Sequence, residues 1–182
     1  MNLEDKLKNI KLVITDVDGV LTDGSLIYDA NGEALKCFNV RDGLGIRLLI
    51  ENGVQVAVLS GRDSAVLRKR ISDLKIEHFL LGKLEKESAC LQLMQEVGVE
   101  AEETAFIGDD SVDLPAFATC GLSFAVADAM EYVKNAANYI LTLPGGKGAF
   151  REVADQILRA QDKADSFESA KGFLKTANKM AQ

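Results

Sequence analysis

The stretch VITDVDGVLTDG, residues 13–24, runs an apolar segment directly into three acidic residues, Asp16, Asp18 and Asp23. Two carboxylates about 4 Å apart repel each other by about 4 kcal/mol at an effective dielectric constant of about 20. A bound cation, a shared proton or a wide separation in space would offset that repulsion. Most of the functional interpretation depends on which of the three applies.

Three further polar clusters follow apolar segments of the same kind. They are Ser60-Gly61-Arg62, Lys83 to Lys86, and Gly108-Asp109-Asp110-Ser111-Val112-Asp113. Each has an ordinary explanation by itself: Asp-x-Asp-Gly and Ser-Gly are typical of turns, paired aspartates cap helices, and a lone lysine is usually solvated. Their joint occurrence at predicted strand ends is harder to explain without a shared site.

The elements that must position these clusters alternate along the chain. Short apolar runs predict strands at 11–15, 54–60, 78–81, 104–108, 122–127 and 138–142. Amphipathic stretches between them predict helices at 43–52, 63–74, 86–97, 111–119, 130–136 and 147–161, with Asp63 suited to an N-cap. Continuous apolar strands separated by helices indicate a doubly wound α/β domain with a parallel sheet covered on both faces. Such sheets bind ligands at the carboxyl ends of their strands.

One segment interrupts the alternation. Residues 25–38 alternate in polarity around Asn31-Gly32, which predicts a β-hairpin inserted after the first strand. We expect a single domain over 1–161, too short for a separate cap domain, followed by a polar tail over 162–182 that forms at most one loose helix.

Composition narrows the class of function. The 182 residues carry a net charge of -7, which argues against general nucleic-acid binding. No apolar run approaches the roughly 20 residues that span a bilayer, and the start is not a signal peptide, so no membrane partner is expected. The three cysteines lack metal-ligand spacing and are expected to be reduced, mostly buried thiols, which places the protein in the cytoplasm.

The clusters together supply the parts of a phosphoryl-transfer site. Asp16, Asp18 and Asp109 could provide oxygen ligands for one Mg²⁺, which would cancel the repulsion within the first cluster. Ser60 and the amides that follow it offer donors for phosphate oxygens, and Lys86 supplies a positive charge. The Asp16/Asp18 pair can then divide the roles of nucleophile and acid.

These residues resemble the four signatures of the haloacid dehalogenase superfamily of phosphatases and phosphotransferases: residues 16–20, Ser60, Lys86, and Gly108-Asp109-Asp110 with Asp113. The resemblance implies that Asp16 attacks phosphorus and that Asp18 protonates the leaving oxygen. It also implies that Mg²⁺ is held by the Asp16 carboxylate, the Asp18 backbone carbonyl and Asp109, and that Ser60 and Lys86 bind the phosphoryl oxygens. Asp110 and Asp113 would orient water and the loop.

The segments DVDGVLTDG, NVRDGLGI, LSGR, IGDDSVDLPA, AVADA and GGKGAFRE are similar to the small capless branch of that superfamily, which acts on phosphorylated 2-keto-3-deoxy sugar acids in lipopolysaccharide biosynthesis. Members of this branch form homotetramers in which a neighbouring subunit closes each site. The expected sugar-binding residues are Asp18, Lys86, Asn39, Val40, Arg41, Asp42, Gly43, Arg47, Arg62 and Arg70.

The arginines give independent support for an acidic sugar. Five of the seven lie between positions 41 and 70: Arg41, Arg47, Arg62, Arg68 and Arg70. Arginine suits a second planar anion such as a carboxylate. We favour Arg62 from its place after Ser60-Gly61, and Arg70 over Arg68 from the resemblance. Two alternatives remain: a phosphatase for another nonulosonic, sialic-type sugar acid phosphate, and a phospho-accepting receiver domain, whose acceptor aspartate would follow the third strand instead of the first.

Overall fold

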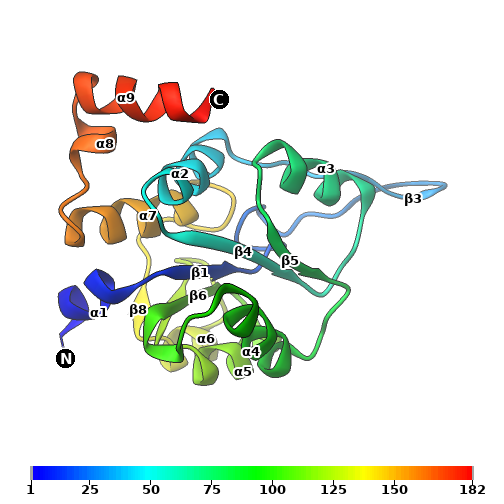
Figure 1. Cartoon of the computed structure of the whole chain (residues 1–182). Helices are drawn as coiled ribbons and strands as arrows, with labels where there is room; N and C mark the ends of the chain where they lie inside the picture. Colours follow the sequence, from blue (N-terminus) through cyan, green and yellow to red (C-terminus); the bar gives the residue numbers. More distant parts are fainter. Residues whose placement is uncertain (1, 182) are drawn as a thin grey trace.

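Six parallel strands form the central sheet of the computed structural model, which describes residues 2–181 (Figure 1). Their order across the sheet is β5-β4-β1-β6-β7-β8. The strands are β1 (Leu12–Thr15), β4 (Gln55–Ser60), β5 (His78–Leu81), β6 (Thr104–Gly108), β7 (Leu122–Ala125) and β8 (Tyr139–Ile140). The chain leaves β1 first toward β5 and later toward β8, so the order reverses between β1 and β6. In such sheets, ligands bind at this switch point.

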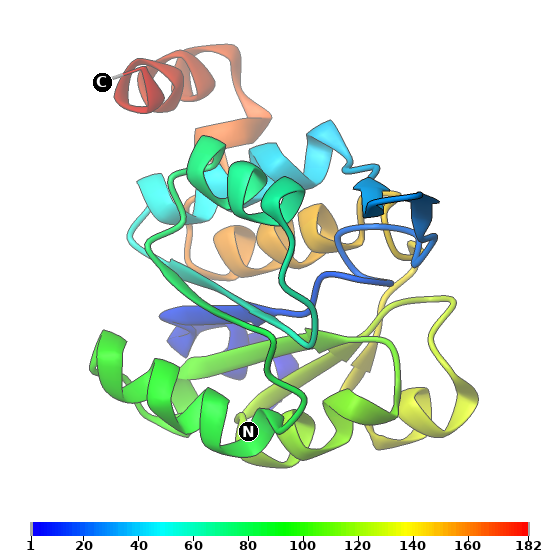
Figure 2. The same ribbon diagram turned by 90° about the vertical axis from the view of Figure 1, so that its right-hand side faces the viewer.

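Helices cover both faces of the sheet, as Figure 2 shows. One layer holds α2 (Val40–Glu51), α3 (Ala65–Asp73) and α7 (Ala149–Ala160), and the other holds α4 (Lys86–Val97), α5 (Leu114–Thr119) and α6 (Glu131–Ala136). Every residue of β1, β6 and β7 is buried, because helices enclose these central strands on both faces. The predicted doubly wound α/β fold is confirmed.

Several helix starts differ from the sequence prediction, and capping side chains decide two of them, those of α2 and α3. The predicted helix over 63–74 begins at Ala65, where Ser64 accepts a hydrogen bond from the Leu67 amide at 3.3 Å. Asp63, the predicted N-cap, pairs instead with Arg68. The predicted helix over 43–52 begins earlier, at Val40. The predicted helix over 111–119 divides into the 3₁₀ turn η2 (Ser111–Asp113) and α5.

The chain begins with a helix that its sequence pattern did not predict. In α1 (Leu3–Asn9) the Asn2 side chain accepts a hydrogen bond from the Asp5 amide at 2.8 Å. Leu7 is buried in the core. This helix has a single buried residue, so its polar sequence carries no clear amphipathic pattern.

The hairpin after β1 forms as predicted, with a different turn. Strands β2 (Ile27–Asp29) and β3 (Gly32–Leu35) pair antiparallel and extend away from the sheet (Figure 1). Asp29 lies opposite Gly32, so the two turn residues are Ala30 and Asn31 and not Asn31-Gly32. Gly32 follows the turn with φ of +122°, a conformation that favours glycine.

The tail contains two short helices instead of one. These are α8 (Asp165–Glu168) and α9 (Ala170–Met180), and α9 lies beside α2 in Figure 1. Gly172 and Thr176 are its buried residues. Phe167 of α8 packs beneath the guanidinium groups of Arg151 and Arg159, at 5.5 and 5.4 Å from its ring centre. The tail is therefore attached to the α2/α7 layer through specific contacts.

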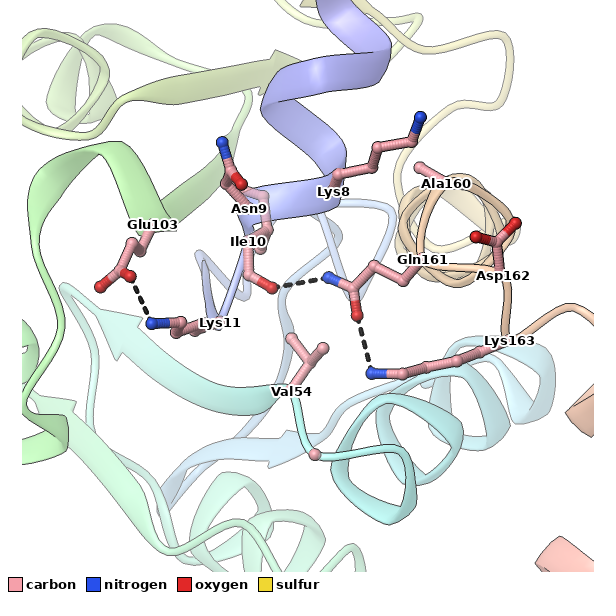
Figure 3. Close-up of a pocket in the computed structure, with 11 residues that line it drawn as sticks. Lys8, Asn9, Ile10, Lys11, Val54, Glu103, Ala160, Gln161, Asp162 and Lys163 are labelled. Carbon is pink, nitrogen blue, oxygen red and sulfur yellow. Dashed lines mark hydrogen bonds and ion pairs between the residues drawn. The ribbon is translucent and has the colours of Figure 1, made fainter.

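A polar cavity of about 520 Å³ lies at the amino end of β1, at the opposite edge of the sheet from Asp16 (Figure 3). Gln161 crosses it and donates a hydrogen bond from Nε2 to the Ile10 carbonyl at 2.8 Å. Lys163 donates to Gln161 Oε1 at 2.9 Å and to the Asn52 carbonyl at 2.8 Å. These bonds anchor the start of the tail to the amino edge of the sheet.

Among residues 2–181, no helix has the length and apolar character needed to cross a membrane.

Candidate active site

Strand β1 delivers Asp16 to the switch point of the sheet. The Asp16 amide still donates to the Ile107 carbonyl of β6 at 3.0 Å, so the residue is held in strand geometry. The chain then turns sharply at Gly19, which has φ of +91°. A Cβ atom at Gly19 would lie 2.0 Å from Oδ2 of Asp109. Glycine is required here both for the turn and for the close approach of Asp109.

Lys86, the first residue of α4, is completely buried beneath Asp16. Its Nζ lies 2.5 Å from Oδ1 of Asp113 and 3.0 Å from Oδ1 of Asp16. Burial alone would lower the pKa of Lys86, but the charges of Asp16 and Asp113 outweigh it and raise that pKa. Lys86 is therefore a fixed positive charge inside the site.

Asp113 holds the loop that carries Asp109. Its Oδ2 accepts hydrogen bonds from the amides of Asp109 at 2.8 Å and Asp110 at 3.3 Å, while Oδ1 accepts from Lys86. A Cβ atom at Gly108 would lie 2.5 Å from Asp113 Oδ2, so this packing needs glycine. Both oxygens of Asp113 already accept hydrogen bonds, which makes it a support for its neighbours.

The cluster of carboxylates at this edge of the sheet fits a divalent cation. Asp16, Asp109 and Asp113 can each present an oxygen within 4.8 Å of the others. Burial, reinforced by the charge of Asp113 and opposed by Lys86, raises the pKa of Asp16 to about 7. Burial and the charges of Asp16 and Asp113 raise the pKa of Asp109 to about 8. Ionised Asp16 and Asp109 side chains without a counter-ion are unfavourable in this buried site. A hard cation such as Mg²⁺ would stabilise the ionised forms, with Asp16 and Asp109 as its carboxylate ligands.

A cavity of about 220 Å³ opens onto these groups. Its lining residues are Asp16, Asp18, Ser60, Gly61, Arg62, Leu84, Lys86, Asp109, Asp110 and Val112. The structure thus brings together seven of the residues predicted at the strand ends: Asp16, Asp18, Ser60, Arg62, Lys86, Asp109 and Asp110. Ser60 Oγ accepts a hydrogen bond from the Arg62 amide at 3.1 Å, which leaves its hydroxyl proton available for a phosphate oxygen.

The hairpin contributes charged residues that the sequence analysis missed. Lys36, whose side chain is 1% exposed, forms ion pairs with Asp18 and, at 3.3 Å, with Glu33. The Arg62 guanidinium lies 3.1 Å from Glu33, 2.6 Å from the Tyr28 hydroxyl and 3.7 Å from Asp18. Position in the chain could have indicated them, because a hairpin that directly follows β1 places its charged residues beside the end of that strand.

Two predicted sugar-binding residues act as helix caps. Asn39 Oδ1 accepts the Arg41 amide at 2.8 Å at the start of α2, and its Nδ2 donates to the Gly146 carbonyl at 3.2 Å. The buried Asp42 carboxylate accepts the amides of Gly148 at 3.2 Å and Arg151 at 2.9 Å at the start of α7. These hydrogen bonds give Asn39 and Asp42 a structural role at the two helix starts. Within one chain, neither side chain lines the cavity around Asp16.

Of the other predicted sugar-binding residues, Asp18, Arg62 and Lys86 line that cavity, whereas Val40, Arg41, Gly43, Arg47 and Arg70 lie outside it in a single chain. Arg70 stacks 5.5 Å from the Phe38 ring centre, and a Cβ at Gly43 would lie 2.4 Å from its Nη2. Arg47 donates to the Leu74 carbonyl at 3.2 Å. Val40 is 81% exposed, and Arg41 lines a separate cavity of about 390 Å³. Their assignment to the substrate stays a prediction.

Comparison with known proteins agrees with this geometry. A family model for haloacid dehalogenase-like hydrolases matches residues 82–148. The 3-deoxy-D-manno-octulosonate 8-phosphate phosphatase of Haemophilus influenzae is 66% identical over 180 residues, which cover 99% of this chain and 100% of the relative. The chain therefore belongs to the haloacid dehalogenase-like hydrolases, the superfamily that its motifs predicted.

Two solved structures share the fold closely. The cobalt-bound Haemophilus influenzae phosphatase superimposes with a TM-score of 0.92 at 69% identity, covering 93% of this chain and 99% of that one. The Moraxella catarrhalis 3-deoxy-D-manno-octulosonate 8-phosphate phosphatase was solved with magnesium, phosphate and the free sugar acid. It superimposes with a TM-score of 0.87 at 40% identity, covering 90% of this chain and 94% of that one.

Proposed function

We propose that this protein is a magnesium-dependent phosphatase that hydrolyses 3-deoxy-D-manno-octulosonate 8-phosphate to the free sugar acid and phosphate, a step of lipopolysaccharide biosynthesis in the cytoplasm. The observation that carries the proposal is the convergence of Asp16, Lys86 and Asp109 on one cavity. The chain that forms it is 66% identical, along 99% of its length, to a phosphatase of that substrate.

Asp16 acts as the nucleophile in this proposal. Its carboxylate attacks phosphorus in line, the bond between phosphorus and the sugar oxygen breaks, and an aspartyl-phosphate forms. Lys86 and the hydroxyl of Ser60 bind the phosphoryl oxygens and stabilise their charge. Bound Mg²⁺, held by the Asp16 carboxylate, the Asp18 backbone carbonyl and Asp109, supplies further charge neutralisation.

Asp18 acts as the acid and then as the base. It protonates the leaving sugar oxygen and afterwards takes a proton from the water that hydrolyses the aspartyl-phosphate. Such acid–base help is worth about 10²–10⁴-fold. Replacing Asp18 with Asn should therefore slow sugar phosphates far more than an activated aryl phosphate, whose leaving group needs no proton. An equal loss on both substrates would remove Asp18 from this role.

Arg62 is the arginine best placed to recognise the sugar carboxylate. It lines the cavity, and its guanidinium already holds the carboxylate of Glu33 at 3.1 Å. The Arg62→Gln variant should lose selectivity for acidic over neutral sugar phosphates. The matched control is Arg68→Gln, since Arg68 pairs with Asp63 on the exposed side of α3. Selectivity retained by Arg62→Gln, or lost equally by the control, would contradict this assignment.

Phosphate release across a substrate panel tests the function itself. The panel compares the octulosonate 8-phosphate with a sialic-type nonulosonic acid 9-phosphate and with glucose 6-phosphate. The proposal expects the highest kcat/KM for the octulosonate phosphate. A preference for the nine-carbon acid would assign the enzyme to that substrate, and equal kcat/KM for glucose 6-phosphate would refute selectivity for sugar acids.

The assembly that we propose is a homotetramer in which hairpins from neighbouring subunits pack together. Leu26, Ile27, Tyr28 and Leu35 of the hairpin are between 45% and 60% exposed. A two-stranded hairpin with such an apolar surface is marginal on its own in water. A neighbouring subunit would also complete each sugar pocket, with residues 39–43, Arg47 and Arg70 nearby.

Light scattering at assay concentrations tests the assembly. Leu35→Lys should weaken it, whereas Leu174→Lys, at a side chain 63% exposed on α9, should leave it intact. A fully active monomer would refute both the tetramer and the need for a neighbouring subunit.

A further inference from the structure

Tyr132 of α6 reaches across to the loop that carries Asp109 and Asp110 (α6 is labelled in Figure 1). Its hydroxyl donates a hydrogen bond to Oδ1 of Asp110 at 3.0 Å. The same hydroxyl accepts a hydrogen bond from Oγ of Ser111 at 2.9 Å. Tyr132 and Asp110 are 22 residues apart in the chain, so the fold and not local sequence brings them together.

The ring of hydrogen bonds closes on one carboxylate oxygen. The Ser111 amide also donates to Asp110 Oδ1, at 2.6 Å. Two donors on the same oxygen fix the rotation of the Asp110 carboxylate at the rim of the cavity. A backbone bond from the Met130 amide to the Asp109 carbonyl, at 3.1 Å, joins the same two segments a second time.

We propose that Tyr132 is a positioning residue that orients Asp110 and thereby sets the affinity of the site for magnesium. This inference rests on the magnesium-dependent function proposed above. Asp110 lines the cavity beside Asp109, and its negative charge adds to the field that attracts a cation. Tyr132 is half exposed and lies outside the lining of that cavity, so its effect reaches the site through Asp110.

The expected change in magnesium affinity follows from the effect of comparable supporting groups in other metal sites. Groups that hydrogen-bond directly to metal ligands change metal affinity by about 10–100-fold when they are removed, and Tyr132 acts one residue further from the metal, through Asp110. Tyr132 is 50% exposed, and water can replace part of its hydrogen bond, so the lower end applies. We expect Tyr132→Phe to weaken magnesium binding about tenfold.

Isothermal titration calorimetry of the metal-free protein with Mg²⁺ alone tests the inference without any substrate. Tyr132→Phe should show the weaker dissociation constant. In phosphate-release assays the magnesium concentration for half-maximal rate should rise by a similar factor, and kcat at saturating magnesium should fall much less. The matched control is Tyr139→Phe, because Tyr139 packs against Phe124 at 5.9 Å between ring centres, away from the cavity.

A double-mutant cycle separates positioning from general stability. In an Asp110→Asn background, Tyr132→Phe should change magnesium affinity by less than about twofold, because the carboxylate that it orients is gone. Equal affinity of Tyr132→Phe and the parent protein would overturn the inference, as would a full tenfold loss in the Asp110→Asn background. Normal magnesium binding by a parent protein that releases no phosphate would refute the proposed function instead.

Discussion

Removing magnesium with a chelator should make the stability of the fold strongly dependent on pH. Burial and neighbouring charges raise the pKa of Asp16 to about 7 and that of Asp109 to about 8, whereas both carboxyls have an ordinary pKa of 3.8. Between these values the unfolded chain releases protons that the folded protein retains. The free energy of unfolding must therefore decrease as the pH rises from about 4 to about 8.

The size of the effect follows from the shift of Asp16. One pKa unit corresponds to about 1.4 kcal/mol. The shift of Asp16 from 3.8 to about 7 thus corresponds to about 4 kcal/mol. Part of the Asp109 shift is caused by Asp16 itself, so the two contributions overlap and do not add. Since domains are stable by about 5–15 kcal/mol, a loss of this size would leave the metal-free protein marginal at alkaline pH.

Urea unfolding followed by circular dichroism, with chelator and with saturating magnesium, measures this dependence between about pH 5 and about pH 8. The metal-free protein should lose about 3 kcal/mol across that interval, because about two of the roughly three pH units between the ordinary and the raised pKa of Asp16 lie above pH 5. Saturating magnesium should largely remove the slope, because a divalent cation favours the ionised carboxylates and binds only the folded state.

Matched variants identify the groups responsible. Asp109→Asn should reduce the slope of the metal-free protein, because one of the two carboxyls with a raised pKa is gone. Asp165→Asn, at an exposed carboxylate of the tail, should leave the slope unchanged. A metal-free protein whose stability stays constant across the interval would show that Asp16 and Asp109 are not the buried, interacting pair described here.

Two further substitutions test the supports of the site. Lys86→Met removes the buried cation between two carboxylates, so it should lower the free energy of unfolding of the metal-free protein by about 3–5 kcal/mol and abolish nearly all phosphate release. The control is Lys69→Met at an exposed ion pair, which should lower the free energy of unfolding by under about 1 kcal/mol. Gly19→Ala should weaken magnesium binding in calorimetry by at least about tenfold, because the new Cβ would displace Asp109. Gly53→Ala is the control, since Gly53 has a similar φ of +85° and open space around it. Equal losses of magnesium affinity at both glycines would contradict the idea that the close approach of Asp109 to Gly19 matters.

The sequence was sufficient to predict the sheet and the residues at its strand ends. Asp16, Ser60 and Asp109 each follow a continuous apolar run, and parallel strands necessarily bring their carboxyl ends to one edge. The family motifs then assigned roles to residues that the topology had already grouped. At these positions the apolar sequence pattern and the parallel sheet both place the side chain at the carboxyl end of a strand.

The remaining features depend on contacts between distant segments. Lys36 looks like an ordinary polar residue of a hairpin until the fold places it against Asp18. Asp42 was predicted to bind the sugar from its place in the NVRDG segment, but no sequence pattern indicates that its carboxylate also caps α7, more than 100 residues further along the chain. Tyr132 carries no sequence signal, because its partner Asp110 belongs to another strand end. Side-chain pairing across elements is what local periodicity does not encode.

The most direct test of the account is the identification of the phosphorylated residue during turnover. The protein is mixed with magnesium and 3-deoxy-D-manno-octulosonate 8-phosphate, quenched in acid within a single turnover, and analysed by peptide mass spectrometry. We expect one added phosphoryl group on the peptide that contains Asp16, and none in the Asp16→Asn protein, which should also release no phosphate while remaining folded. Steady phosphate release by a folded Asp16→Asn protein, or a phosphoryl group on any other residue, would contradict it.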